Sequence, residues 1–250
     1  MDNKPFEDSI PYPFKGKNDP NLGPVAVLVS NQEDLDLLRG LMGLSKHRKL
    51  LMSSVYLGNH ALNRLSIAGP LIGAPYAVMV LENLIAWGAR HFLFFGWCGA
   101  ISRKVKIGDI IVPTSAIIDE GTSKHYATNP NLVVKPSASV LKTITTSFNQ
   151  KNIDFHKGLI WTTDAIYRET GEKVEYYQKK NVLAVEMEAS ALFTVGKFRN
   201  VETGCILAVS DELSTFHWHR GFHNKRFIKN RRAVLEVIIH LCKNISIRQS

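Results

Sequence analysis

Cysteine is scarce in this chain of 250 residues. The three cysteines are Cys98, Cys205 and Cys242, and two of them lie inside apolar runs. Their spacing fits neither a disulfide framework nor a set of metal ligands, which excludes a cysteine-stapled secreted domain and a zinc-binding module. We therefore expect three reduced thiols in the core of a cytoplasmic protein.

Long hydrophobic segments are also missing. No apolar run reaches the roughly 20 residues that a membrane-spanning helix needs, and the polar start, Met1–Pro5, does not resemble a signal peptide. Hydrophobic residues make up 45% of the chain, which suits a well-buried core. The expectation is a cytoplasmic protein without a membrane partner.

Acidic residues are too few to balance the basic ones. The formal net charge is +9, and much of the basic and imidazole content lies in residues 217–232. Basic residues interleaved with aromatic ones can bind nucleic acid through phosphate contacts and base stacking. No helix-turn-helix, zinc-finger or RNA-recognition signature accompanies this segment, so we expect no nucleic-acid partner. The segment is instead predicted to be a solvated surface or a lid over an anionic ligand.

Strand and helix patterns alternate along the chain without a linker or a repeat. Residues 1–23 are predicted to form an irregular arm and residues 24–250 one domain. The alternation indicates an α/β fold with a central mixed or parallel sheet. Strands are expected at Val25–Val29, Ser53–Leu57, Ala61–Ile67, His91–Phe95, Gly108–Pro113, Ala116–Ile118, Gly158–Trp161, Val182–Val185 and Cys205–Val209. Helices are expected at Gln32–Met42 with Asn31 as its cap, Tyr76–Trp87, Ser137–Gln150, Gly171–Lys180, Ala189–Phe198 and Arg232–Lys243.

Acidic residues follow two of these strands, at the sheet edge where ligands of α/β proteins bind. Glu186 and Glu188 flank Met187 where a strand is expected to run into a helix, and Ser210-Asp211 end a later strand. Such a group can hold a sugar, because Glu188 accepts bonds from vicinal hydroxyls while Met187 packs on the apolar sugar face. Asp211 could then protonate a departing base. The alternative is that these acids only favour a helix start or cap a turn.

A series of short segments in fixed order extends this pattern. The series consists of Gly73–Pro75, Gly96–Ala100, Gly108–Val112, Asp119–Tyr126, Gly158–Ile160 with Asp164-Ala165, Val185–Ala189 and Ser210-Asp211. From about Val25 to the last helix, the chain resembles the nucleoside phosphorylase and nucleosidase superfamily. The resemblance implies a single-domain, three-layer α/β/α fold around a central mixed, partly barrel-like sheet. It also implies a homo-oligomer, as a dimer, trimer or hexamer.

The resemblance further implies cleavage of the N-glycosidic bond of a purine-like nucleoside or nucleotide, without a cofactor and with phosphate as a possible co-substrate. Glu188, Met187 and Glu186 would then bind the ribose. Asp211, with Ser210 beside it, would hydrogen-bond and protonate N7 of the purine. Further substrate contacts are expected from Val185, Ile166, Tyr167, Cys98 and Gly99.

The sequence departs from the family where phosphate is normally held. Phosphorylases use a glycine–aspartate–proline loop and an arginine after the first strand, then an arginine and a small hydroxyl residue around the later glycine turn. Here the first loop is Ser30-Asn-Gln-Glu-Asp34, Phe94 stands at the later arginine position, and Trp97 replaces the small hydroxyl residue. Because phosphate needs several cationic or amide donors, we expect the usual phosphate pocket to be lost and Trp97 to fill its volume.

The first loop indicates a different acceptor. In the nucleosidase branch an acid in this loop activates water, and an ungapped match puts Asp34 there. The alternative is an ordinary acid in the first turn of a helix. Water is therefore slightly favoured over phosphate. Displaced arginines, such as Arg226, leave phosphorolysis open, and a catalytically inactive nucleoside-binding protein is a third reading.

Overall fold

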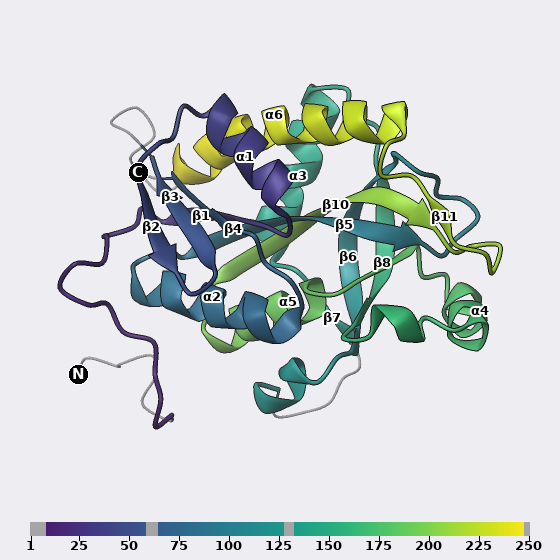
Figure 1. Cartoon of the computed structure of the whole chain (residues 1–250), viewed down its shortest axis with the longest axis horizontal. Coiled ribbons are helices and arrows are strands. Elements are labelled where there is room, and N and C mark those ends of the chain that lie inside the picture. The colour runs from purple at the N-terminus through teal and green to yellow at the C-terminus, as the bar shows by residue number, and fades with distance from the viewer. Residues whose placement is uncertain (1–8, 59–64, 128–132, 248–250) are drawn as a thin grey trace.

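A mixed β-sheet forms the centre of the protein (Figure 1). The computed structural model describes residues 9–58, 65–127 and 133–247, and eleven strands of this part join one sheet. The strands are β1 Val25–Val29, β2 His47–Leu50, β3 Ser53–Leu57, β4 Leu65–Gly69, β5 His91–Ala100, β6 Ile110–Asp119, β7 Val133–Val134, β8 His156–Thr163, β9 Ala184–Glu186, β10 Glu202–Glu212 and β11 His219–Arg220. The helices are α1 Gln32–Leu41, α2 Ala74–Ala86, α3 Ala138–Gln150, α4 Gly171–Lys179, α5 Ala189–Phe198 and α6 Lys225–Ile247, with 3-10 turns η2 Thr122–His125 and η3 Ile166–Arg168.

Five of the strands close into a barrel-like ring. β10 pairs with β5 on one side and with β6 on the other, and the pairs β6–β8, β8–β9 and β9–β5 complete the circuit. β1, β4, β3 and β2 extend the sheet outward from β5. Both parallel and antiparallel pairs occur, so the expected mixed, partly barrel-like sheet is confirmed.

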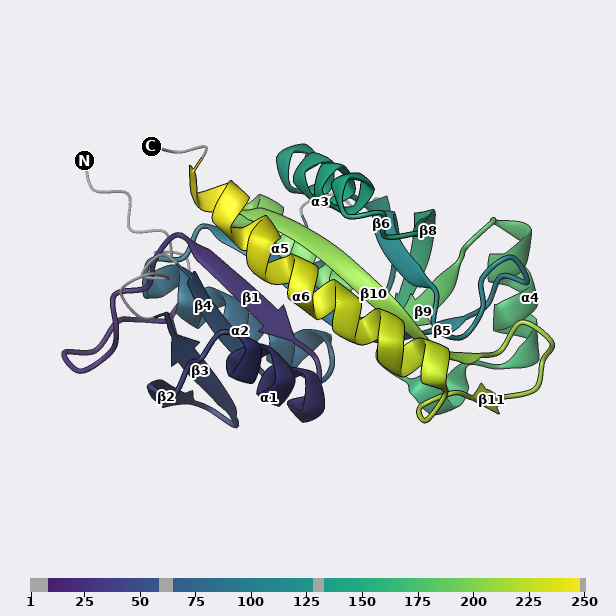
Figure 2. The same ribbon diagram turned by 90° about the horizontal axis from the view of Figure 1, so that it is seen from above.

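Helices cover both faces of the sheet (Figures 1 and 2). α2 packs on α5 over one face, while α6 packs on α1 and α3 over the other. Successive side chains of a strand point to opposite faces, and β5 shows the result: Phe94 belongs to the core under α2 and α5, and Phe95 to the core under the other three helices. The three-layer α/β/α arrangement is therefore confirmed, and β5 is buried from both sides.

The boundaries differ from the sequence predictions in two instructive places. α6 begins at Lys225, seven residues before Arg232, because its first turns are polar on their solvent side while Phe227 is fully buried. The sequence does not predict β2, whose residues are mostly exposed; it becomes a strand by pairing with β3 at the sheet edge. The first four residues of the strand predicted over Ala61–Ile67 lie outside the described residues.

The described part of the N-terminal arm, residues 9–23, contains no helix or strand. Its end is attached to the domain, since the backbone N–H of Leu22 donates to the carbonyl of Trp87 at 2.9 Å. After β1, Asn31 caps α1 as predicted: its side chain accepts a hydrogen bond from the N–H of Asp34 at 2.9 Å. Within the described ranges no helix is long and apolar enough to cross a membrane.

Candidate active site

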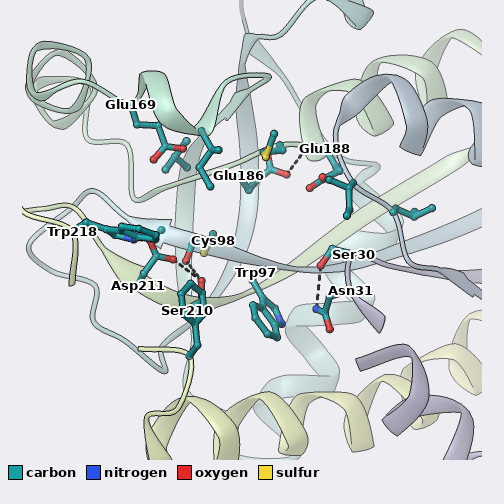
Figure 3. A pocket seen from close by; sticks show the side chains of 17 residues that line it. Ser30, Asn31, Trp97, Cys98, Glu169, Glu186, Glu188, Ser210, Asp211 and Trp218 are labelled. Carbon is teal, nitrogen blue, oxygen red and sulfur yellow. Dashed lines mark hydrogen bonds between the residues drawn. The ribbon is translucent and has the colours of Figure 1, made fainter. Parts of the chain in front are cut away.

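A pocket of about 230 Å³ opens at the carboxyl ends of the central strands (Figure 3). Segments at or after the ends of β1, β4, β5, β8, β9 and β10 line it, as expected for a ligand site in an α/β sheet. The structure brings together the following residues predicted for the site: Trp97, Cys98, Gly99, Ile166, Val185, Glu186, Met187, Glu188, Ser210 and Asp211. The two acidic motifs therefore share one cavity.

Glu186 and Glu188 have different environments at one end of the pocket. Glu186 accepts hydrogen bonds from the backbone N–H groups of Glu188 and Ala189, both at 2.7 Å, and from the hydroxyl of Thr162. These bonds hold the first turn of α5, where a carboxylate is also favoured by the helix dipole. Glu188 accepts a bond of 2.6 Å from the N–H of Gly73 and is also hydrogen-bonded to the backbone of Met187. Burial raises the pKa of both carboxyl groups, and the charge of Glu186 raises that of Glu188 further.

Asp211 occupies the other end of the pocket. Its Oδ1 accepts a bond from the hydroxyl of Ser210 at 2.6 Å, and its Oδ2 accepts one from Nε1 of Trp218 at 2.8 Å. Burial raises the pKa of Asp211, although both bonds act in the opposite direction. Gly99 permits this position, because a Cβ there would lie 3.1 Å from Oδ2 of Asp211 and 2.5 Å from the side chain of Leu213. The site thus holds a carboxyl group with a raised pKa, as general acid catalysis requires.

Trp97 forms a wall of the pocket, and Asp34 lies behind it. Nε1 of Trp97 donates to Oδ2 of Asp34 at 2.6 Å, and Arg231 lies 3.1 Å from the other carboxylate oxygen. The Arg231 guanidinium is also 5.2 Å from the centre of the indole ring. Asp34 is fully buried and does not line the pocket. The structure therefore does not support the expected role of Asp34 as the base that activates water; the side chain anchors Trp97 instead.

Three other predicted residues also lie outside the pocket lining. Phe94 is buried in the core, and Tyr167 is 91% exposed. Arg226 forms an ion pair with Asp109 beside a second cleft, so it is not directed at the site. Arg220 is nearer, since its guanidinium lies 5.1 Å from the ring centre of the pocket-lining Trp218.

Several lining residues are not predicted by the sequence. They are Ser30, Asn31, Leu71, Ile72, Glu169, Trp218 and Phe222. Ser30 and Asn31 directly follow β1, so a search of every strand end finds them. Trp218 and Phe222 belong to the basic segment 217–232. The sequence interpretation of this segment depends on its basic residues and does not single out these two aromatic side chains, which line the pocket. This part of the segment therefore lines the site, whereas Arg226 lies away from it.

The pocket is rich in acid. Glu169, Glu186, Glu188 and Asp211 line it, and no lysine, arginine or histidine side chain of the described residues joins them. Nor do the described residues contain a cluster of three or more side chains suited to a metal ion. An anion entering the pocket meets neutral donors and acids.

The comparisons with known proteins give consistent relatives. A guanosine phosphorylase of Halorubrum lacusprofundi is 34% identical over 60% of this chain and 61% of its own length. A DeoD-type purine nucleoside phosphorylase of Clostridium novyi is 30% identical over 64% of this chain and 69% of its own. The crystal structure of a uridine phosphorylase from Vibrio fischeri has a TM-score of 0.78 at 26% identity, covering 89% of this chain and 93% of that one. The match to the first relative spans about three fifths of that protein.

All three relatives are named as phosphorylases, so the expected preference for water over phosphate finds no support among them. The sequence model of the phosphorylase superfamily matches residues 24–244, nearly the whole chain, including every strand and the greater part of α6. The protein is therefore a member of the phosphorylase superfamily.

Proposed function

We propose that the protein cleaves the N-glycosidic bond of a purine-like nucleoside with phosphate as the acceptor. One observation carries this proposal: Glu188 and Asp211, from segments 23 residues apart, line the same small pocket. A nucleoside has a polar sugar and a basic heterocycle at its two ends, and the pocket has a carboxyl group for each.

The proposed binding mode follows from the partners that each acid already has. Glu188 accepts backbone bonds at Gly73 and Met187 and keeps lone pairs for the ribose hydroxyls, while Met187 packs on the sugar. Glu186 holds the start of α5 and so positions Glu188. At the other end Asp211, oriented by Ser210 and Trp218, contacts N7 of the purine, and Val185, Ile166, Cys98 and Gly99 border the nucleoside.

The reaction then requires a proton at the leaving base. As the bond between C1′ and N9 breaks, its electron pair moves into the heterocycle, and Asp211 donates its proton to N7. Phosphate forms the new bond to C1′ and yields a sugar 1-phosphate. A carboxyl group whose pKa is raised by burial retains its proton closer to neutral pH, which suits this acid role.

For phosphate, the described pocket lining supplies only neutral donors, such as the hydroxyl of Ser30. Of the displaced cations, Arg226 is paired with Asp109 and Arg231 with Glu33 and Asp34. Arg220, stacked on Trp218, is the best candidate within the described chain. A second subunit of the homo-oligomer expected from the sequence is the other source of positive charge.

A second candidate function is nucleoside binding without turnover. The specific observation in its favour is that Trp97 is fixed by Asp34 in a pocket lined by four acids and by no cation of the described residues. Such a pocket holds a neutral nucleoside but opposes an anionic acceptor.

The two functions are distinguished by incubating the purified protein with a panel of nucleosides, with and without phosphate. Phosphate-dependent release of base together with a sugar 1-phosphate supports the proposal, whereas binding without release supports the second candidate. Asp211→Asn is expected to lower turnover by about 100-fold or more, the scale of general acid catalysis. Asp36→Asn, in the exposed and unrelated first turns of α1, is the matched control. Near-normal turnover in Asp211→Asn removes Asp211 from the acid role.

A further inference from the structure

Glu169 is the acid of the pocket that the proposed reaction leaves without a task. It lies between η3 and α4, and its carboxyl group faces the same space as Asp211 and Trp218 (Figure 3). The other three acids of the pocket all accept hydrogen bonds from protein groups. Within the described ranges, the Glu169 carboxyl group has no hydrogen-bond partner. It is thus available to a ligand.

The surroundings of Glu169 make a carboxyl group without a hydrogen-bond partner unfavourable in free energy. Burial, together with the charge of Asp211, raises the pKa of Glu169 to about 8, although Lys173 acts in the opposite direction. Lys173 does not bond to Glu169, because its ammonium donates to Asp119 at 2.8 Å. A half-buried polar group without a partner is destabilising, and a ligand that supplies the missing bonds recovers that free energy.

The position of Glu169 defines which part of a ligand it meets. Glu188 lies at the opposite end of the pocket, where the sugar is proposed to bind, and Asp211 is proposed to contact N7. In a purine, N7 and the substituent at C6 lie on neighbouring edges of the ring system. A heterocycle held at Asp211 therefore presents its 1- and 6-positions to the next polar group along the wall, and Trp218 provides an apolar face beside it.

We propose that Glu169 recognises the 1,6-edge of the purine and thereby selects nucleosides that carry an adjacent hydrogen-bond donor and acceptor at these two positions. This inference rests on the proposed function. A protonated carboxyl group offers one O–H donor and one carbonyl acceptor side by side. That pair is complementary to a 6-aminopurine, with its donor at N6 and acceptor at N1, and to a 6-oxopurine, with its acceptor at O6 and donor at N1.

The test compares nucleosides that differ at this edge. Adenosine and inosine carry it, whereas benzimidazole riboside keeps the ribose and the equivalent of N7 but lacks both edge groups. Glu169→Ala is expected to weaken binding of adenosine and inosine by about 10- to 100-fold in calorimetry, the effect of losing hydrogen bonds in a buried site. Binding of benzimidazole riboside should change by less than about twofold. Glu172→Ala, an exposed acid in the first turn of α4, is the matched control and should change none of the three.

The pH dependence of adenosine affinity distinguishes recognition by Glu169 from a purely structural role, which would not change this dependence. Adenosine does not titrate between about pH 6 and about pH 9, and over this range the wild-type Glu169 loses its proton and with it the donor for N1. Wild-type affinity for adenosine should therefore fall as the pH rises. Glu169→Gln keeps a donor and an acceptor at every pH, so its affinity should stay flatter. Asp211 and Lys173, the charged groups that face Glu169, are present in both proteins, so the comparison isolates position 169.

Three results overturn the inference: equal loss of affinity for all three nucleosides in Glu169→Ala, no loss for any of them, or the same pH curve in wild type and Glu169→Gln. These outcomes differ from failure of the proposed function. Edge-dependent binding without base release supports the role of Glu169 while refuting cleavage. A wild-type protein that binds none of the nucleosides refutes both.

Discussion

Removal of the Arg231 guanidinium is expected to destabilise the protein more than neutralisation of Asp34, its buried partner. The side chain of Asp34 is 0% exposed and that of Arg231 5%, so the two charges meet in the interior. Arg231 has a second partner, Glu33, whose side chain is 67% exposed. Among the described residues, Asp34 has no second cation within ion-pair distance. The two substitutions therefore leave behind different uncompensated charges.

The magnitudes follow from this asymmetry. Arg231→Met leaves the Asp34 carboxylate buried without a counter-ion, a change that costs about 3–5 kcal/mol in proteins. Asp34→Asn keeps an acceptor for the Trp97 indole and leaves Arg231 paired with Glu33, so about 1–2 kcal/mol is expected. The double variant should lose less than the sum, because the two sites share one interaction.

Urea unfolding at fixed protein concentration measures these differences as changes in the free energy of unfolding. The control is Arg232→Met, one residue further along α6, where the side chain is 61% exposed and pairs with the exposed Glu236. Its expected change is below about 1 kcal/mol. A loss below about 1 kcal/mol in Arg231→Met, or an equal loss in the two single variants, refutes the reasoning. If Asp34 were instead a catalytic base, Asp34→Asn would abolish turnover and leave stability unchanged.

Two further predictions concern the pocket itself. Trp218→Phe keeps an aromatic ring but removes the hydrogen bond to Oδ2 of Asp211. Because that bond lowers the pKa of Asp211, its loss should move the limb of the kcat/KM profile that reports the protonated acid to higher pH. An unshifted limb speaks against Asp211 as the acid. Glu188→Gln should weaken binding of a purine nucleoside by about tenfold and leave binding of the free base unchanged, because in the proposed orientation only the sugar contacts position 188. Calorimetry with both ligands tests this. Equal losses of affinity for the two ligands contradict the proposed orientation.

Much of the fold could be predicted because its elements carry strong periodic signals. β1, α5 and the centre of β10 have apolar patterns that local sequence alone defines, and their predicted positions agree with the structure. β2 is different, since its residues are polar and its strand conformation comes from pairing with β3. Such an element exists only through tertiary contact, which no local pattern records.

The sequence predicts the site residues that directly follow strands, but it does not show whether a side chain reaches the pocket or is buried behind it. Glu188 and Asp211 follow strands and lie in one pocket. Asp34 follows a strand as well, yet the indole of Trp97, 63 residues later, stands between it and the cavity. Glu169 shows the reverse case: a polar loop gives no sign in the sequence that one carboxyl group turns inward.

The acids of the pocket also bear on which molecules can enter it. Four ionised carboxylates in a small cavity would repel a phosphate dianion strongly, because interactions between charges strengthen as water is excluded. Burial reduces this repulsion, because it raises the pKa values of all four carboxyl groups, that of Glu169 to about 8. The pocket therefore carries less negative charge near neutral pH than its composition suggests. A neutral nucleoside is indifferent to the remaining charge, whereas a nucleotide brings a second anion. In the proposed reaction, the same desolvation that keeps a proton on Asp211 also lowers the barrier to an anionic acceptor, while the negative charge that remains favours a neutral nucleoside over a nucleotide.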